Sequence, residues 1–209
     1  IPYLFGTTFW ATAARPDRTA IMPCLHDEPH AYQDVVLDCL AATRGVLANT
    51  DTERQLVGDI LRGHRGGHVP PMEVVGVGYD DVPAVTPDEA VRFCHARGIE
   101  PGYLLYAGRR EEGKGLRELF DLYRGYAAAV PDPRPLALMG TGALPIPRDL
   151  RPQVIDLGFV PDADKHVALG AASVLLHPSR LESLGMVMLE AWLAGTPAVV
   201  NGGSPVLVE

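Results

Sequence analysis

The chain is poor in lysine and cysteine and has no long apolar run, and each shortage excludes a class of protein. Only two of its 18 basic residues are lysines and the formal net charge is −8, so it lacks the basic surface of a general nucleic-acid-binding protein. The three cysteines are widely spaced and form no CxxC pair, which argues against a zinc site or a disulfide framework and favours a reducing compartment. No run approaches about 18 apolar residues, so we expect neither a transmembrane helix nor a signal peptide.

What is present is the composition of a globular α/β protein. The 209 residues are 47% hydrophobic and 21% charged, enough for one large domain or two small ones. Strands alternating with helices are typical of parallel sheets that carry helices on both faces. Predicted strands lie at 3–5, 20–25, 45–48, 72–78, 103–108, 136–140, 153–159, 174–176 and 197–200, and predicted helices at 32–42, 51–62, 88–97, 116–129, 162–171 and 184–194.

The segment 81–87 contains two prolines and is predicted to be a linker between two Rossmann-like lobes, 1–80 and 88–209. The chain opens on an apolar strand, and 206–209 resembles the first turn of an unfinished helix. We therefore expect a fragment of a longer protein, with an N-terminal lobe that is incomplete and a C-terminal lobe that is truncated at its end.

The most informative stretch is 172–209, which predicts a strand, a loop, a helix and another strand. Pro178 ends the first strand, Ser183 is suited to cap the helix and Gly195 to end it. Gly185 would let a ligand approach the helix N-terminus, where free N–H groups favour a phosphate.

Two acidic residues, Glu182 and Glu190, stand eight positions apart in this stretch. Glu190 interrupts an otherwise apolar helix, so its burial would need hydrogen-bond donors, which a sugar diol could supply. On spacing alone, the alternative that both carboxylates are simply solvated is equally compatible.

A second charged turn, Gly108 to Gly115, follows a predicted strand. Ligands of open α/β sheets bind beyond the carboxyl ends of the strands. Arg109 and Lys114 could there neutralise a diphosphate and stabilise it as it leaves. Taken alone, the segment is equally well explained as an ordinary charged turn between strand and helix.

Together these stretches resemble the donor-site signature of the retaining family 4 glycosyltransferases (glycosyltransferase group 1), which have the GT-B fold. Their pattern reads roughly P-S-x-x-E-[ST]-[FL]-G-x-x-x-x-E-A-x-A-x-G-x-P-[VA]-V. The matching positions are Pro178, Ser179, Glu182, Ser183, Leu184, Gly185, Glu190, Ala191, Gly195, Pro197 and Val199. The turn at 108–115 also matches the family pattern G-R-x-x-x-x-K-G.

The resemblance implies a retaining transferase that moves a hexose from a nucleotide-diphosphate sugar. The C-terminal lobe would hold the donor, with Glu190 on the ribose hydroxyls and Glu182 on the hexose. The N–H groups of 183–185, which include Ser183 and Leu184, would hold sugar or phosphate. Arg109 and Lys114 would clamp the diphosphate, so that neither a metal nor a further cofactor is needed; the donor would be a UDP- or GDP-sugar.

Two further positions gain a role from the resemblance. Phe159 and Val160 stand where the family's backbone meets the nucleotide base, although a buried Phe at a strand end would give the same pattern. His26 follows a strand of the first lobe, where the family often has a His facing the donor sugar. A surface turn is the other reading of His26.

The expected partners are a nucleotide-sugar donor and a sugar, lipid or small-molecule acceptor, with no nucleic acid. The expected location is the cytoplasm, with peripheral association with a membrane left open. Two alternatives share the fold: a non-catalytic nucleotide-sugar binding module and a GT-B sugar-nucleotide epimerase. Because both ends look cut, we expect these residues alone to bind donor weakly and to turn over poorly.

Overall fold

The computed structural model describes residues 6–80 and 83–209. The chain forms two compact units: one comprises residues up to 79 with 181–184 and 205–209, and the other comprises 80–180 with 185–204. The strand predicted at 3–5 and part of the linker predicted at 81–87 lie outside the described residues.

The first unit is built on a three-stranded parallel sheet of order β1-β2-β3. Its strands and helices are β1 (Ala20–Ile21), β2 (Gly45–Ala48), β3 (Met72–Val74), α1 (Gly6–Ala14), α2 (Asp34–Ala42) and α3 (Asp51–Gly63), with 3₁₀ turns at Pro16–Arg18, Pro29–Tyr32, Arg65–Gly67 and Pro205–Leu207.

The core of this unit lies between the sheet and the helices α2 and α3. Thr50 caps α3 by accepting a hydrogen bond from the Glu53 backbone N–H, as the sequence suggests. On α2 the buried stripe is Val36, Leu37, Cys39 and Leu40, whereas Val35 is 50% exposed. This apolar stripe faces the sheet and α3 in the core of the first unit.

The second unit is built on a five-stranded sheet of order β6-β5-β4-β7-β8, in which every pairing is parallel. Its elements are α4 (Pro87–His95), β4 (Leu104–Ala107), α5 (Leu116–Ala129), β5 (Leu136–Met139), β6 (Val154–Gly158), α6 (Asp162–Gly170), β7 (Val174–His177), α7 (Met186–Leu193) and β8 (Ala198–Val200), with a 3₁₀ turn at Glu112–Lys114.

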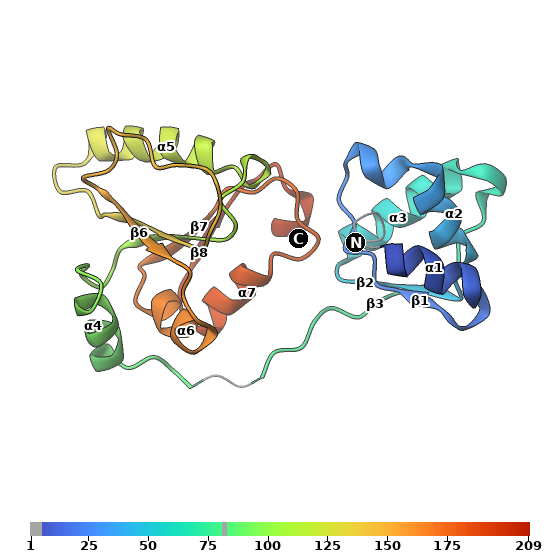
Figure 1. Ribbon diagram of the computed structural model, residues 1–209, viewed down its shortest axis with the longest axis horizontal. Helices are drawn as coiled ribbons and strands as arrows, with labels where there is room; N and C mark the ends of the chain where they lie inside the picture. The colour runs from blue at the N-terminus through green and yellow to red at the C-terminus, as the bar shows by residue number, and fades with distance from the viewer. Residues whose placement is uncertain (1–5, 81–82) are drawn as a thin grey trace. The chain divides into compact units, whose positions relative to one another are not determined.

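Helices cover this sheet from both sides (Figure 1): α5 lies over one face, and α6 and α7 lie over the other. The two faces are seen at β4, where Tyr106 packs with α5, while Tyr103, directly before the strand, donates its hydroxyl to the Ala168 carbonyl of α6. Burial raises the pKa of Tyr103 far above its usual range. The predicted α/β architecture with parallel sheets is confirmed.

One cap differs from the expectation. Helix α7 begins at Met186, and its N-cap is Gly185 in a left-handed conformation with φ 75° and no side-chain hydrogen bond. The prediction that Ser183 caps this helix is therefore wrong. Only glycine adopts this conformation at little cost, so the chain turns into the helix through Gly185.

Within the residues described, no helix combines the length and the apolar character needed to cross a membrane.

Candidate functional site

Because all strands of the second unit are parallel, their carboxyl ends share one edge of the sheet. The loops that leave this edge carry most of the predicted donor-site residues. They are the turn at 108–115 after β4, the Gly-rich turn at 140–142 after β5, the pair Phe159–Val160 after β6, and the loop that follows His177 at the end of β7.

Glycines allow two of these loops to touch through their backbones. A β-carbon on Gly140 would collide with the carbonyl of Gly108, and one on Gly142 would lie 2.5 Å from the carbonyl oxygen of Arg110. The loops are also joined by a hydrogen bond of 2.8 Å from the Arg110 N–H to the Thr141 carbonyl. The turn after β4 is therefore fixed against the turn after β5.

The other end of the same turn lies against β7. A β-carbon on Gly115, which has φ 70°, would lie 2.5 Å from the Pro178 carbonyl oxygen. That oxygen also accepts a hydrogen bond of 2.9 Å from the Asn201 side chain. Lys114, directly before Gly115, is thereby held at the loop that begins the signature 178–199.

The two arginines of the turn differ sharply. The Arg110 side chain is 11% exposed and pairs with Asp156 at 2.8 Å, so it is part of the scaffold. The Arg109 side chain is 70% exposed and pairs with Glu111 at 3.0 Å. The buried Tyr106 hydroxyl donates to the Arg109 carbonyl at 2.7 Å, which fixes the backbone beneath the exposed guanidinium.

Of the pair after β6, Phe159 lies at the surface and Val160 in the core. Phe159 is 74% exposed and Val160 is buried, so the reading of Phe159 as a buried strand-end residue is excluded. The backbone at this point is held by a bond of 2.7 Å from the Gly140 N–H to the Gly158 carbonyl. An exposed ring on a fixed backbone is a surface on which a planar group could stack.

Glu190 is neither solvated nor without a donor. Its two carboxylate oxygens each lie 2.6 Å from Nζ of Lys165, and the side chains of Lys165 and Glu190 are 30% and 21% exposed. Lys165 comes from the first turn of α6 and was not singled out by the sequence patterns. The available signal was its rarity, because it is one of two lysines in the chain.

The first unit holds the remaining predicted residues. His26 lies in the loop after β1, with Nδ1 3.4 Å from the Glu28 carboxylate. Glu182, Ser183 and Leu184 lie in the segment 181–184, which groups with this unit, whereas Gly185 and α7 group with the other.

A buried carboxylate supports the loop that carries His26. Glu53 is 1% exposed and accepts hydrogen bonds from the N–H of Leu25 at 2.5 Å and from the N–H and side-chain amide of Asn49 at 2.7 and 3.1 Å. Burial raises the pKa of Glu53, although these donors oppose the shift. Cys24, beside Leu25, is the described non-glycine residue with positive φ, at 47°. Sequence analysis missed Glu53, which stands in an amphipathic helix like any surface acid.

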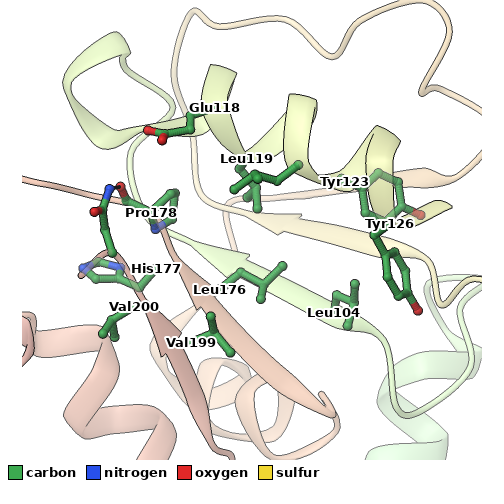
Figure 2. A pocket seen from close by; sticks show the side chains of 12 residues that line it. Leu104, Glu118, Leu119, Tyr123, Tyr126, Leu176, His177, Pro178, Val199 and Val200 are labelled. Carbon is green, nitrogen blue, oxygen red and sulfur yellow. Dashed lines mark hydrogen bonds between the residues drawn. The ribbon is translucent and has the colours of Figure 1, made fainter. Parts of the chain in front are cut away.

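A groove of about 460 Å³ opens elsewhere in the second unit, between α5 and the strands β4, β7 and β8. Figure 2 shows Tyr123 and Tyr126 at one end and His177 at the other, with Leu176 between them. Its lining contains one carboxylate, Glu118, and no Lys or Arg. Such a surface does not suit a diphosphate. The groove is therefore distinct in chemical character from the loops at the carboxyl ends of the strands.

In the part of the chain that the structure describes, no cluster of three or more His, Cys, Asp or Glu residues is arranged to hold a metal ion.

Comparisons with known proteins fit this geometry. Residues 88–209 match the model of the family described as "Glycosyl transferases group 1". O-antigen chain mannosyltransferase B of Escherichia coli is 33% identical over 110 residues, which cover 48% of this chain and 28% of that protein.

Solved structures extend the likeness to nearly the whole chain. HepE of Anabaena, in complex with UDP and glucose, has a TM-score of 0.76 and 21% identity, with 96% of this chain and 58% of the HepE chain covered. The pneumococcal O-GlcNAc transferase GtfA, in complex with UDP and GlcNAc, has a TM-score of 0.62 and 13% identity, with 87% of this chain and 36% of GtfA covered. The chain thus spans little more than half of the HepE chain. At identities this low, the structural likeness shows the fold alone. Since the family match extends over more than half of its residues, the chain belongs to the glycosyl transferases group 1 family.

Proposed function

We propose that the protein is a retaining glycosyltransferase that moves a hexose from a nucleotide-diphosphate sugar to an acceptor. The observation that carries this is the packing of the turn 108–115 between the turn after β5 and the Pro178 loop. This packing gathers Arg109, Lys114 and the start of the 178–199 signature at the carboxyl ends of the strands. Complexes of structural relatives with UDP and with UDP-glucose support a nucleotide-sugar donor.

In this mechanism the diphosphate lies over the turn 108–115. The exposed Arg109 leaves Glu111 and pairs with phosphate oxygens, since an Arg–phosphate pair is bidentate and stronger than an exposed Arg–Glu pair. Lys114 adds a second cation, and the N-terminus of α7 adds the positive end of the helix dipole. These charges stabilise the diphosphate as the glycosidic bond breaks, and the reaction runs without a metal.

The other roles follow the same assignment. Glu190 accepts hydrogen bonds from the ribose hydroxyls, and the exposed ring and fixed backbone at Phe159 meet the base. Glu182 contacts the hexose, and His26 is assigned to the same sugar. The acceptor attacks the face from which the diphosphate departs, and a phosphate oxygen takes its proton, so the anomeric configuration is retained.

The acceptor is a sugar, a lipid or a small molecule, and the reaction takes place in the cytoplasm. A membrane-bound acceptor would bring the protein to the cytoplasmic face of the membrane.

The test is an NMR assay of the full-length protein with UDP-glucose, GDP-mannose and other nucleotide sugars, with EDTA present and with a panel of acceptors. A transferase forms an α-linked product from an α-linked donor in EDTA, and without acceptor it only hydrolyses the donor slowly. Interconversion of the donor alone would identify an epimerase. Tight donor binding with neither transfer nor hydrolysis would identify a binding module.

A further inference from the structure

The donor lobe contains a cation that the signature does not account for. Lys165 approaches the Glu190 carboxylate with Nζ 2.6 Å from both oxygens. The pair joins α6 to α7, and both side chains are largely removed from solvent. Lys165 is thus the charged partner of Glu190, the residue assigned to the ribose.

The location of Lys165 ties it to the strand edge. It lies in the first turn of α6, which begins at Asp162, two residues after Val160. Lys165 is therefore close in the sequence to Phe159, whose ring is exposed at the same end of the sheet. Lys165 is 30% exposed, so it lies at the surface of this part of the sheet and not in the core.

The energetics favour a positioning role. A half-buried carboxylate needs donors, and in an α7 that is otherwise apolar Lys165 supplies them. An ionised carboxylate has about four acceptor sites, so one ammonium leaves room for a diol. The Lys165 ammonium hydrogen-bonds Oε1 of Glu190, whereas Oε2, 2.6 Å from the same nitrogen, is buried and has no hydrogen-bond partner among the described residues, so it can accept from a ribose hydroxyl.

We propose that Lys165 is a positioning residue of the nucleotide site, which orients the Glu190 carboxylate toward the ribose hydroxyls of the donor. This role rests on the proposed function, because it takes Glu190 as the ribose contact. It predicts that Lys165 affects ligands that have both ribose hydroxyls and has no effect on ligands that lack them.

The chain offers a matched control on the same helix. Asp164, the neighbour of Lys165, pairs with Arg97 at 3.0 Å and joins α6 to the turn that follows α4. Asp164→Asn removes a partly buried inter-helix ion pair without touching Glu190. If Lys165 only tied helices together, the two substitutions would act alike on ligand binding.

The experiment is calorimetric titration of the protein with UDP, GDP and ADP and with the 2′,3′-dideoxy form of the one that binds. Lys165→Met is expected to weaken the ribonucleotide about tenfold, the effect of one charge-assisted hydrogen bond, and to leave the dideoxy form unchanged. Lys165→Arg is expected to keep most of the affinity, and Asp164→Asn all of it. Thermal melting confirms that each variant is folded, and Lys165→Gln, which also removes the charge, carries the same test if Lys165→Met does not fold.

Equal weakening of the ribonucleotide and the dideoxy form, or no weakening of either, would overturn the role of Lys165. If Glu190→Gln weakens the ribonucleotide while Lys165→Met does not, the positioning role fails and the proposed function stands. If the folded wild-type protein binds none of the three nucleotides, the proposed function and the role of Lys165 fail together.

Discussion

Gly115 lies directly against the backbone of Pro178, and a β-carbon built on Gly115 would come within 2.5 Å of the Pro178 carbonyl oxygen. The two residues are far apart in the sequence, and each belongs to a different part of the family pattern. The contact shows why the pattern ends in glycine after Lys114: the close approach and the φ of 70° both exclude a side chain.

Gly115→Ala is therefore expected to move the turn away from β7. A left-handed alanine costs about 1–2 kcal/mol, and the backbone oxygen opposite cannot rotate aside as a side chain could. We expect nucleoside diphosphate affinity to fall about tenfold or more, measured by calorimetry. Gly113→Ala, in the same turn with open space around it, is the control and should bind normally. Equal affinity of the two variants would show that the packing of this turn is irrelevant to the ligand.

The two neighbouring arginines should separate binding from stability. Arg109→Ala removes an exposed side chain whose ion-pair partner is the exposed Glu111, so the melting temperature should change little while diphosphate affinity falls about tenfold or more. Arg110→Ala should lower the melting temperature, because it leaves Asp156 without its partner at the sheet edge. A lower melting temperature for Arg109→Ala together with an unchanged melting temperature for Arg110→Ala would contradict the site geometry.

Glu53 should be essential to the first unit. Glu53→Ala leaves the buried N–H groups of Leu25 and Asn49 without acceptors, at a cost of about 1–3 kcal/mol for each. Urea unfolding monitored by circular dichroism should show this loss, whereas Gln55→Ala, on the exposed face of the same helix, should change stability little. A Glu53→Ala variant as stable as the wild type would mean that the two N–H groups find other partners.

The same residue predicts a pH dependence with a defined sign. Burial raises the pKa of Glu53 above its ordinary value of 4.5, so the folded state holds this proton more strongly than the unfolded state. The stabilising effect of the proton is fully present below pH 4.5 and is lost as the pH rises through the folded pKa. Glu53→Gln cannot titrate, so its stability relative to the wild type should increase over that range. Parallel stability curves from pH 4 to 8 would rule out a raised pKa.

Local pattern predicted much of the fold. Helix α5 occupies the predicted residues 116–129, because its apolar stripe is regular and Gly115 marks its start. Helix α3 begins at the predicted residue 51 for a similarly local reason, because the Thr50 side chain caps it by accepting from the Glu53 N–H. The parallel order of strands followed from their alternation with helices.

Features that depend on contacts between distant segments could not be predicted in this way. The cap of α7 is Gly185 rather than Ser183, because the loop after β7 sets the direction in which the chain enters the helix. The ion pair of Lys165 with Glu190 joins two helices, and Glu53 is buried by loops that follow two different strands. Arg110 is held by its ion pair with Asp156, whereas Arg109 is exposed, and this difference likewise depends on the position of Asp156. The functional roles of the site residues stay predictions.

The measurement that tests the central claim most directly is calorimetric titration of the 209-residue chain with UDP, GDP and ADP, repeated on Glu190→Ala and Arg109→Ala. The donor-site account predicts that one nucleotide binds and that each substitution weakens it about tenfold or more, Arg109→Ala through the diphosphate and Glu190→Ala through the ribose. A folded wild-type chain that binds none of the three, or variants that bind as tightly as the wild type, would contradict it.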